Sequence, residues 1–402
     1  MIVAFCILGA LLVYLSWKSL CDGIDYLNYV RSECARPQSE YVPFATVIVP
    51  CRGVDAGLAE NLGALMQQAY PGYEVIFAVD DENDAAVLVI RNLINTIASP
   101  GLKARKMIVA AKAECSSQKV ENLREAVLHA SDESRVFVFA DSDARPSPNW
   151  LRYLIAPLED DKVGAATGYR WYISKKFTLG SELRSAWNAS IATALGPNTK
   201  SNFCWGGSMA MRRDKFDQLE MREKWAGTLS DDFAVTRAMN DADLPIVFVP
   251  QALTASIESC TLAEMLEFTT RQMKITRVYA PKLWAKSFVG SALFNVVMGF
   301  ALLIIYFQFK TTLPFAAALI ILSAVTILGT AKAWLRLRAV RLVLSGYRPE
   351  LKRQFWTQNT LWTIAPSIFL YNSIAALLSR RLRWRGTVYE LKSPTETVII
   401  AR

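Results

Sequence analysis

The sequence is poor in the residues that most often build metal centres and nucleophilic triads. Its 402 residues include a single histidine, His129, which falls in a helical pattern. One histidine argues against a Ser-His-Asp triad and against a multi-histidine metal site. The seven cysteines are odd in number, scattered, and form no Cys-x-x-Cys pair. They argue against a disulfide framework and a zinc site, and they favour a reducing, cytosolic environment.

Two common nucleotide-binding motifs are also missing from the chain. It contains no Gly-x-Gly-x-x-Gly sequence and no Walker-type lysine loop. Dinucleotide binding of the Rossmann kind and P-loop chemistry therefore have no support from the sequence.

Apolar residues, by contrast, are abundant, and positive charge is in excess. The apolar fraction is 52% and the net charge is +9. A basic surplus can reflect nucleic-acid binding, contact with anionic lipid, or the positive-inside bias of a membrane protein. The positions of the long apolar runs decide between these explanations.

The first apolar run predicts a membrane anchor at residues 1–20. Residues 1–17 carry no charge, and the first cation is Lys18. No basic segment precedes the run and no small-residue cleavage site follows it, so a secretory signal is not predicted. Cations after the run favour an N-terminus outside and a cytoplasmic domain behind it. The run is short for a span, and a buried helix is the alternative interpretation.

Further apolar runs near the C-terminus predict a multi-pass integral membrane protein. Residues 287–307 and 312–330 are each long enough to span a bilayer, with a short polar connection at 308–310. The basic segment 331–358 is predicted to lie on the cytoplasmic leaflet. Two neighbouring membrane segments argue against nucleic acid as its partner. Cations flank residues 360–379 on both sides, so this run either spans the membrane or re-enters it.

Between the anchor and these runs, residues 44–280 predict an α/β domain. Short apolar strands alternate with helices of 10 to 15 residues, which is typical of βαβ units on a mostly parallel sheet. A paired glycine within the strand predicted at 203–211 marks either a close approach of backbone to ligand or a bulge. The other strands are predicted at 45–50, 74–79, 106–110, 136–140, 163–170 and 245–249.

Acidic residues follow two of these strands at the point where each ends. Asp141-Ser142-Asp143 comes directly after Val136–Ala140, and Asp80-Asp81 comes after the strand at 74–79. Parallel sheets bind ligands at the carboxyl ends of their strands. The Asp-x-Asp pair therefore either caps a turn or holds a divalent cation with a phosphorylated substrate.

Glycosyl transfer from a nucleotide sugar has physical requirements that these residues meet. The leaving diphosphate concentrates negative charge, which a divalent cation on Asp141 and Asp143 would neutralise. The acceptor hydroxyl has a pKa far above 7, so a carboxylate must take its proton. Asp232 is available for that role, although capping a helix is an alternative use of this acidic pair. The cations that can clamp the phosphates are Lys119, Arg271 and Lys274.

A series of short motifs runs through this domain in a fixed order. It comprises Arg52-Gly53-Val54-Asp55, Tyr70-Pro71-Gly72-Tyr73-Glu74, Val79-Asp80-Asp81-Glu82-Asn83-Asp84, Lys119-Val120-Glu121-Asn122-Leu123, Asp141-Ser142-Asp143 and Asp231-Asp232-Phe233. In this order the motifs resemble the ceramide glucosyltransferase group of the family 2-type membrane glycosyltransferases. The resemblance covers the whole α/β domain, and the flanking apolar segments fit it.

This resemblance implies a fold, a reaction and its partners. The fold would be GT-A, a Rossmann-like domain with a mixed, mostly parallel sheet. The reaction would be that of a hexosyltransferase, moving sugar with inversion from a UDP-sugar to a membrane lipid with the help of Mg²⁺ or Mn²⁺. By motif match, Asp232 would be the base, Asp143 with Asp141 would hold metal and diphosphate, and Asp81 the nucleotide. The other substrate-binding residues are predicted to be Asp84, Lys119, Asp231, Arg271 and Lys274.

One motif departs from the family pattern. Arg/Gln-x-x-Arg-Trp falls on Arg271-Gln272-Met273-Lys274-Ile275, where lysine replaces arginine and isoleucine replaces tryptophan. Lysine lacks the bidentate fork of arginine, so the grip on diphosphate is expected to differ. The missing tryptophan argues against a processive polysaccharide synthase, the first alternative function. A non-catalytic membrane scaffold with a degenerate transferase domain is the second.

Overall fold

The computed structural model describes residues 2–307 and 313–402. Two compact units are present, and each is assembled from separate stretches of the chain. The helical unit comprises residues 1–31, 176–193 and 259–379, and the sheet unit comprises residues 32–175, 194–258 and 380–402. The polar connection predicted at 308–310 lies outside the described residues.

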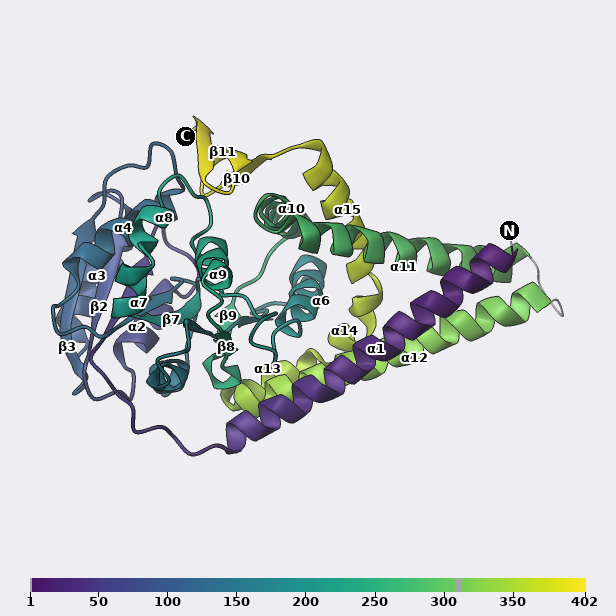
Figure 1. The fold of residues 1–402 in the computed structure, drawn as a ribbon, viewed down its shortest axis with the longest axis horizontal. Helices are drawn as coiled ribbons and strands as arrows, with labels where there is room; N and C mark the ends of the chain where they lie inside the picture. The colour runs from purple at the N-terminus through teal and green to yellow at the C-terminus, as the bar shows by residue number, and fades with distance from the viewer. Residues whose placement is uncertain (1, 308–312) are drawn as a thin grey trace. The chain divides into compact units, whose positions relative to one another are not determined.

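A seven-stranded sheet in the order β3-β2-β1-β4-β7-β5-β8 is the centre of the sheet unit. Its two edge strands, β3 and β8, are labelled in Figure 1. Strands β1 to β4 are mutually parallel where they pair, β7 is antiparallel to β4 and β5, and β8 is parallel to β5. The prediction of a mixed, mostly parallel sheet is therefore confirmed, with β4 in its middle. The strands are β1 (Ala45–Pro50), β2 (Tyr73–Val79), β3 (Leu102–Val109), β4 (Val136–Ala140), β5 (Ala165–Thr167), β7 (Ser208–Arg212) and β8 (Ile246–Phe248).

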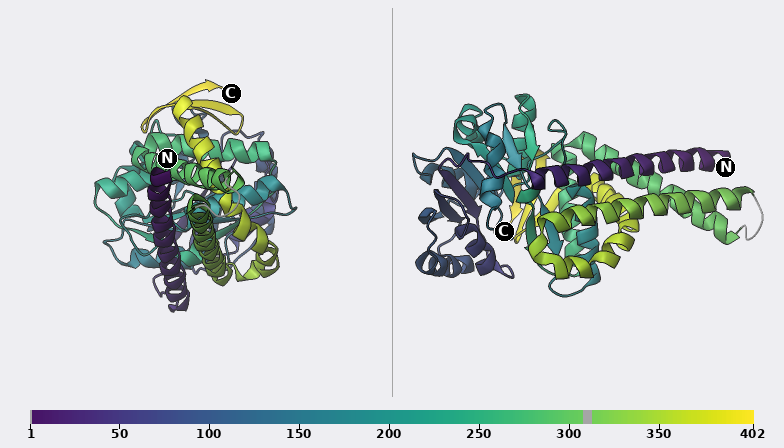
Figure 2. Two further views of the ribbon diagram at one scale, coloured as in Figure 1. Left: turned by 90° about the vertical axis from the view of Figure 1, so that its right-hand side faces the viewer. Right: turned by 90° about the horizontal axis from the view of Figure 1, so that it is seen from below.

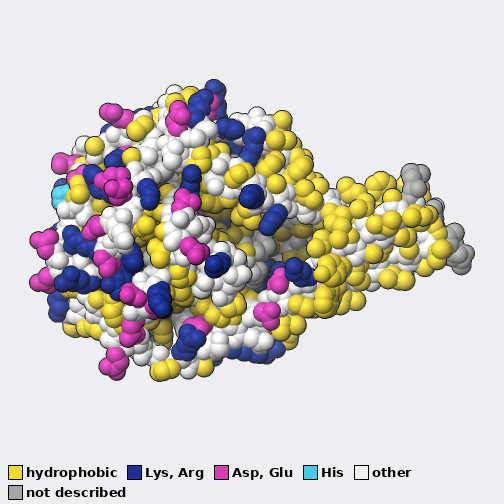
Figure 3. All heavy atoms as spheres, viewed as in Figure 1, with side chains coloured by type: hydrophobic (Ala, Val, Ile, Leu, Met, Phe, Trp, Pro, Cys, Tyr) yellow, Lys and Arg dark blue, Asp and Glu magenta, His cyan; other side chains and the backbone are white. Residues whose placement is uncertain are grey.

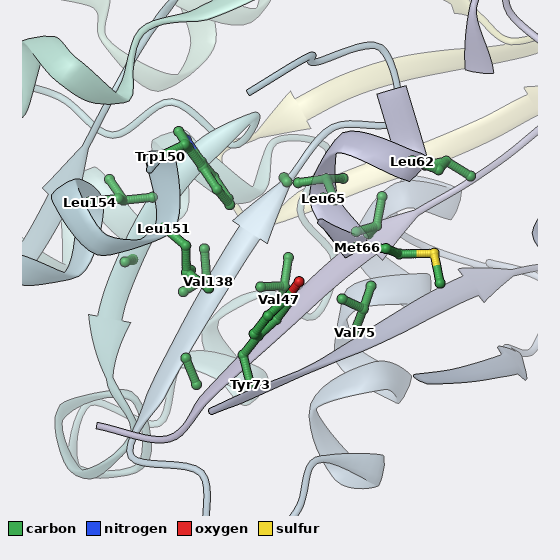
Figure 4. Close-up of a cluster of buried hydrophobic side chains, with 14 of the residues drawn as sticks. Val47, Leu62, Leu65, Met66, Tyr73, Val75, Val138, Trp150, Leu151 and Leu154 are labelled. Atoms are coloured by element: carbon green, nitrogen blue, oxygen red, sulfur yellow. The ribbon is translucent and has the colours of Figure 1, made fainter. Parts of the chain in front are cut away.

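Successive residues of the central strands enter two different hydrophobic cores. In β4, Val138 joins one core, whereas Phe137 and Phe139 join the other. Both faces are thus buried, which explains why β4 is a continuous apolar run without polar alternation. Figure 4 shows the first core, where α2 (Leu58–Met66) and α5 (Trp150–Ile155) cover the strands. Helices α3 (Ala85–Thr96), α4 (Gln118–Ala126) and α9 (Asp231–Asp241) complete the two layers.

Two smaller sheets accompany the large one. Strands β6 (Arg170–Ile173) and β9 (Thr254–Ile257) form a parallel pair. The strand predicted at 163–170 is thus divided between β5 and β6, and the one predicted at 203–211 begins only at Ser208. Residues 380–402 form an antiparallel sheet that the apolar pattern did not predict, made of β10 (Arg381–Trp384), β11 (Thr387–Ser393) and β12 (Glu396–Ala401).

Three helices of the helical unit are long and apolar enough to cross a membrane. They are α1 (Ile2–Ala35), α11 (Pro281–Phe307) and α12 (Leu313–Val343). Their contact faces share a core that includes Leu12, Val297 and Val325. Figure 2 shows the ribbons of these helices from two further sides. Their outward faces remain apolar, as the space-filling view shows (Figure 3). Helix α1 extends beyond the anchor predicted at residues 1–20 and continues to Ala35.

The last apolar run is broken. Residues 355–363 and 365–378 form two helical pieces that meet at a bend of 53°. Such a pair is either a broken span or a re-entrant loop, so both predicted alternatives for 360–379 stay open. The basic segment at 331–358 contains the end of α12, then α13 (Arg348–Arg353) and α14 (Phe355–Thr360). The remaining long helices of this unit are α6 (Leu179–Ala192), α10 (Leu262–Tyr279) and α15 (Ala365–Leu378).

The two faces of α3 provide a test of the core. Ile90 is fully buried in the first core, and Leu88 on the same helix is 74% exposed. We expect Ile90→Ala to lower the free energy of unfolding by about 2–5 kcal/mol, because it removes packed methyl groups and leaves a cavity. Leu88→Ala, the matched control, should change stability little. Unfolding of the purified protein, followed by tryptophan fluorescence, measures both, and equal losses would contradict the burial of Ile90.

Candidate active site

The acidic motifs meet at one edge of the sheet. Strands β2, β1 and β4 are neighbours and parallel, so the residues that follow them emerge on the same side. This side carries Asp80-Asp81 after β2 and Asp141-Ser142-Asp143 after β4. Asn61 on α2 holds the second loop, because its side-chain nitrogen donates to the Ser142 carbonyl at 3.2 Å.

Lys119 joins the loop after β4 to the start of α9. Its Nζ lies 2.8 Å from Asp141 Oδ1 and 3.0 Å from Asp231 Oδ1. Ser117, two residues earlier, caps α4, since its side chain accepts a hydrogen bond from Val120 N, and Lys119 therefore lies in the first turn of the helix. The ammonium predicted to clamp phosphate is thus engaged by two carboxylates, and its role in donor binding stays a prediction.

Arg170, which sequence analysis did not select, neutralises the Asp-x-Asp pair from the other side. Its guanidinium lies 3.6 Å from Asp141 Oδ2 and 3.2 Å from Asp143 Oδ2. The same group lies 4.6 Å from the centre of the Trp205 ring, and the ring adds a cation–π attraction. One signal was available: Arg170 is the sole charged residue between Lys162 and Lys175.

Burial and charge move the carboxyl pKa values in different directions. Burial raises the pKa of Asp143 to about 6, against the attraction of Arg170. Burial, with repulsion from Asp232 and Asp141, raises the pKa of Asp231 to about 6. Burial acts in the same sense on Asp141, but Lys119 and Arg170 outweigh it and hold its pKa below the usual range. The cluster therefore contains one firmly ionised carboxylate and two that are easier to protonate.

Asp232 lies beside this cluster in a fixed orientation. Its Oδ1 accepts hydrogen bonds from Ser230 Oγ at 2.5 Å and from Phe233 N at 2.8 Å. Its Oδ2 accepts a longer bond from Gly206 N at 3.3 Å. Asp232 is half-buried, whereas Asp231 is buried. Ser230 occupies the N-cap position of α9 without a side-chain cap bond.

The paired glycines leave the space that the carboxylates occupy. A Cβ at Gly206 would lie 2.3 Å from Asp231 Oδ2, and one at Gly207 would lie 2.8 Å from Asp141 Oδ2. The backbone therefore approaches the acidic groups more closely than any larger residue allows. The two glycines precede β7, so they serve close packing at the site rather than a bulge in that strand.

The acidic residues after β2 have different surroundings. Asp81 is half exposed and pairs with Lys112 at 3.4 Å, and the Asn83 backbone N–H holds its pKa below the usual range. Both oxygens of Asp84 accept from Gly53 N, at 2.9 and 3.0 Å, and Oδ1 also caps α3. Asp84 thus holds the loop after β1 through its hydrogen bonds with Gly53 N. Its part in substrate binding remains a prediction.

Arg271 and Lys274 belong to the helical unit, whereas the acidic cluster lies in the sheet unit. Both are on α10, which begins with a capping box between Thr261 and Glu264. The Arg271 guanidinium lies 5.4 Å from the centre of the Phe268 ring, and burial lowers the pKa of Lys274. Their predicted contact with the donor stays a prediction.

The carboxylates fit a cation that is shared with a substrate. Among residues 2–307 and 313–402, no three His, Cys, Asp or Glu side chains are grouped to hold a metal ion. A complete protein cage is not required, because Mg²⁺ commonly takes one or two carboxylates together with substrate phosphates. Asp143 Oδ1 is buried without a hydrogen-bond partner, as expected for an oxygen that a ligand satisfies.

Comparison with known proteins decides the family. The sequence profile of glycosyl transferase family 21 matches residues 6–397. The chain belongs to glycosyl transferase family 21. The match covers both units, so the apolar helices and the C-terminal sheet are part of the family 21 pattern together with the α/β domain. Glycosyl transfer is accordingly the reaction class of this protein.

Solved structures of other glycosyltransferases resemble the chain distantly. One is the mannosyltransferase PcManGT from Pyrobaculum calidifontis, in complex with GDP-Man and Mn²⁺, with 18% identity, a TM-score of 0.44, and coverage of 92% of this chain and 99% of that one. Another is TarS 1-349 from S. aureus, with 13% identity, a TM-score of 0.36, and coverage of 88% and 97%. These values are too low to transfer substrates or site residues to this family 21 protein.

Removal of Lys119 tests whether the cluster depends on its charge. Lys119→Met leaves partly buried Asp141 and buried Asp231 without their shared cation, and we expect a loss of roughly 3–5 kcal/mol in the free energy of unfolding. Asp231→Asn added to Lys119→Met should recover part of that loss. Lys200→Met, which breaks an exposed pair with Asp243, is the control and should change little. Equal stability of all variants would show that the cluster is not held by charge.

Proposed function

We propose that this family 21 glycosyltransferase transfers a hexose from a UDP-sugar to a hydroxyl of a membrane lipid, with inversion at the anomeric carbon. The observation that carries the proposal is the cluster of Asp141, Asp143, Asp231 and Asp232 at the carboxyl edge of the sheet. It supplies separate carboxylates for the diphosphate end of the donor and for the acceptor proton.

Asp232 is the proposed general base. As the acceptor oxygen forms its bond to the anomeric carbon, the bond from that carbon to the diphosphate breaks, and the hydroxyl proton passes to Asp232. Bonds from Ser230 and Phe233 hold Oδ1. Among the described residues, Oδ2 accepts only the long bond from Gly206 N, which leaves it able to accept the proton. A single displacement of this kind inverts the anomeric configuration.

Asp141 and Asp143 are the proposed ligands of a divalent cation, Mg²⁺ or Mn²⁺. When bound, that ion would neutralise the negative charge on the leaving diphosphate. Arg170 is positioned to keep both carboxylates ionised and in place before the donor arrives. Asp81, at the end of β2, is the proposed contact for the nucleotide.

The helical unit supports a lipid as the acceptor. Three described helices have the length and apolar character of membrane spans, and one further bent pair accompanies them. This is a small number of spans for a channel that would extrude a polymer, which favours single addition over processive synthesis. A cytoplasmic active site is the proposed orientation, because the sheet unit follows the first span and its basic flank.

Asp232→Asn tests the base. The amide keeps the shape of the side chain but cannot take a proton, so we expect transfer to lipid acceptor to fall by about 10²–10⁴-fold. Binding of UDP-sugar should persist, because Asp232 is not assigned to the donor. Release of UDP in detergent micelles measures the first effect, and isothermal titration measures the second.

The matched control is Asp241→Asn. Asp241 lies on the same helix, and its side chain is 71% exposed beside Arg237. We expect this variant to retain wild-type transfer. Undiminished turnover in Asp232→Asn would remove Asp232 from the role of base.

Metal removal tests the second assignment. Chelation with EDTA should abolish transfer, and Mn²⁺ or Mg²⁺ should restore it. Asp143→Asn should raise the Mn²⁺ concentration needed for half-maximal UDP binding by about tenfold or more, because one charged ligand is lost. Titration of Mn²⁺ at fixed UDP gives this value. Full activity in EDTA would contradict a metal-dependent mechanism.

A further inference from the structure

The C-terminal sheet lies on loops at the carboxyl edge of the large sheet. Although residues 380–402 follow all the apolar helices in sequence, they belong to the sheet unit. Arg402 donates to the Ala113 carbonyl, and Gln118 N donates to Tyr389 Oη at 3.5 Å. Arg385 donates to Asp55 in the loop after β1. The small sheet thus contacts the loops that follow β1 and β3.

The hairpin between β10 and β11 places an arginine at its tip. Trp384 pairs with Thr387, which leaves Arg385-Gly386 as a two-residue turn. Both residues have positive φ, 49° for Arg385 and 85° for Gly386. Such turns favour Asn-Gly or Gly-Gly, since a larger first residue is strained there. Arginine therefore stands at this position against the backbone preference, which is consistent with a role for its side chain.

The Arg385 side chain binds a carboxylate in the loop after β1. Its Nη1 donates to Asp55 Oδ1 at 2.7 Å, and Nη2 donates to Asp55 Oδ2, so the pair is bidentate. Hydrogen bonding by Asp55, with attraction from Asp143 and Glu258, raises the pKa of Arg385. Attraction from Arg385 also contributes, after Lys119 and Arg170, to the lowered pKa of Asp141. The guanidinium is thus within electrostatic reach of both proposed metal ligands.

Accessibility separates Arg385 from the other two cations of the cluster. Its side chain is 40% exposed, compared with 14% for Lys119 and 11% for Arg170. Lys119 and Arg170 are each bound to two carboxylates of the cluster. An arriving diphosphate therefore meets Arg385 as the accessible one of these three cations. The planar fork that now holds the Asp55 carboxylate matches a phosphate group equally well.

We propose that Arg385 binds the diphosphate of the sugar nucleotide, exchanging the Asp55 carboxylate for phosphate oxygens when the donor enters. Asp55 holds the guanidinium in an extended, ionised state until then. The inference rests on the proposed function, because it deepens the assignment of a nucleotide-diphosphate donor. It also gives the C-terminal sheet a role: it carries a donor-binding residue from the far end of the chain.

Nucleotide binding to the full chain in detergent, with Mn²⁺ present, tests this role. Arg385→Gln should weaken UDP binding by about tenfold to a hundredfold, because a charge-assisted bidentate bond is lost. Binding of uridine, which has no phosphate, should not change. Arg385→Lys should weaken UDP binding less than Arg385→Gln, since it keeps the charge without the fork. Isothermal titration measures UDP, and saturation-transfer NMR measures uridine.

Two further variants distinguish phosphate binding by Arg385 from a merely structural contact between Arg385 and Asp55. Arg383→Gln removes the same charge from an exposed position two residues away on the same hairpin, and should leave UDP binding unchanged. Asp55→Asn removes the competing carboxylate, and should leave UDP binding equal or stronger. If Asp55→Asn weakens UDP binding as much as Arg385→Gln does, or if uridine binding falls in parallel, the Arg385–Asp55 contact is merely structural and the proposal is wrong.

The outcome also distinguishes this inference from the proposed function. UDP binding that Arg385→Gln leaves intact would overturn the role of Arg385 alone. Wild-type protein that binds neither UDP nor GDP with Mn²⁺ would contradict the donor assignment itself, and with it the proposal for Arg385.

Discussion

The site depends on one electrostatic constraint: closely spaced carboxylates that repel one another need cations between them. Asp141 and Asp143 lie in the loop after β4 and Asp231 begins α9. At close range, with limited access to water, the mutual repulsion of these three carboxylates is costly. Lys119 and Arg170 resolve this repulsion by bridging pairs of carboxylates. Four segments of the chain therefore converge because none of these charges is stable there alone.

Other features around the cluster follow from this requirement. The backbone at Gly206 and Gly207 has to pass within van der Waals range of two carboxylates, which only glycine permits. Two apolar cores fix β4 from both faces, so the loop that begins at Asp141 starts from a rigid position. The carboxylates of the cluster are thus placed by packing beneath them and by charge around them.

The C-terminal sheet adds a further pairing of a cation with a carboxylate outside the central cluster. Arg385 adds a third cation, but one that is more exposed and held by a carboxylate outside the central cluster. The sheet unit is complete only after the chain has passed through the apolar helices, because its last strands are residues 380–402.

The sequence by itself determined the parallel strands at the centre of the large sheet, the long apolar helices and the acidic motifs, but not the C-terminal sheet or the division between β5 and β6. Consecutive apolar residues predict a strand that is buried on both faces, such as β4. An Asp-x-Asp pair directly after it predicts a ligand-binding edge, because parallel sheets bind ligands at the carboxyl ends of their strands. The tertiary structure alone decided which carboxylates pair with Lys119, that Arg170 pairs with Asp141 and Asp143, and that Arg385 contacts Asp55. The reason is physical: burial leaves a periodic trace along the chain, whereas an ion pair between residues 330 positions apart leaves none.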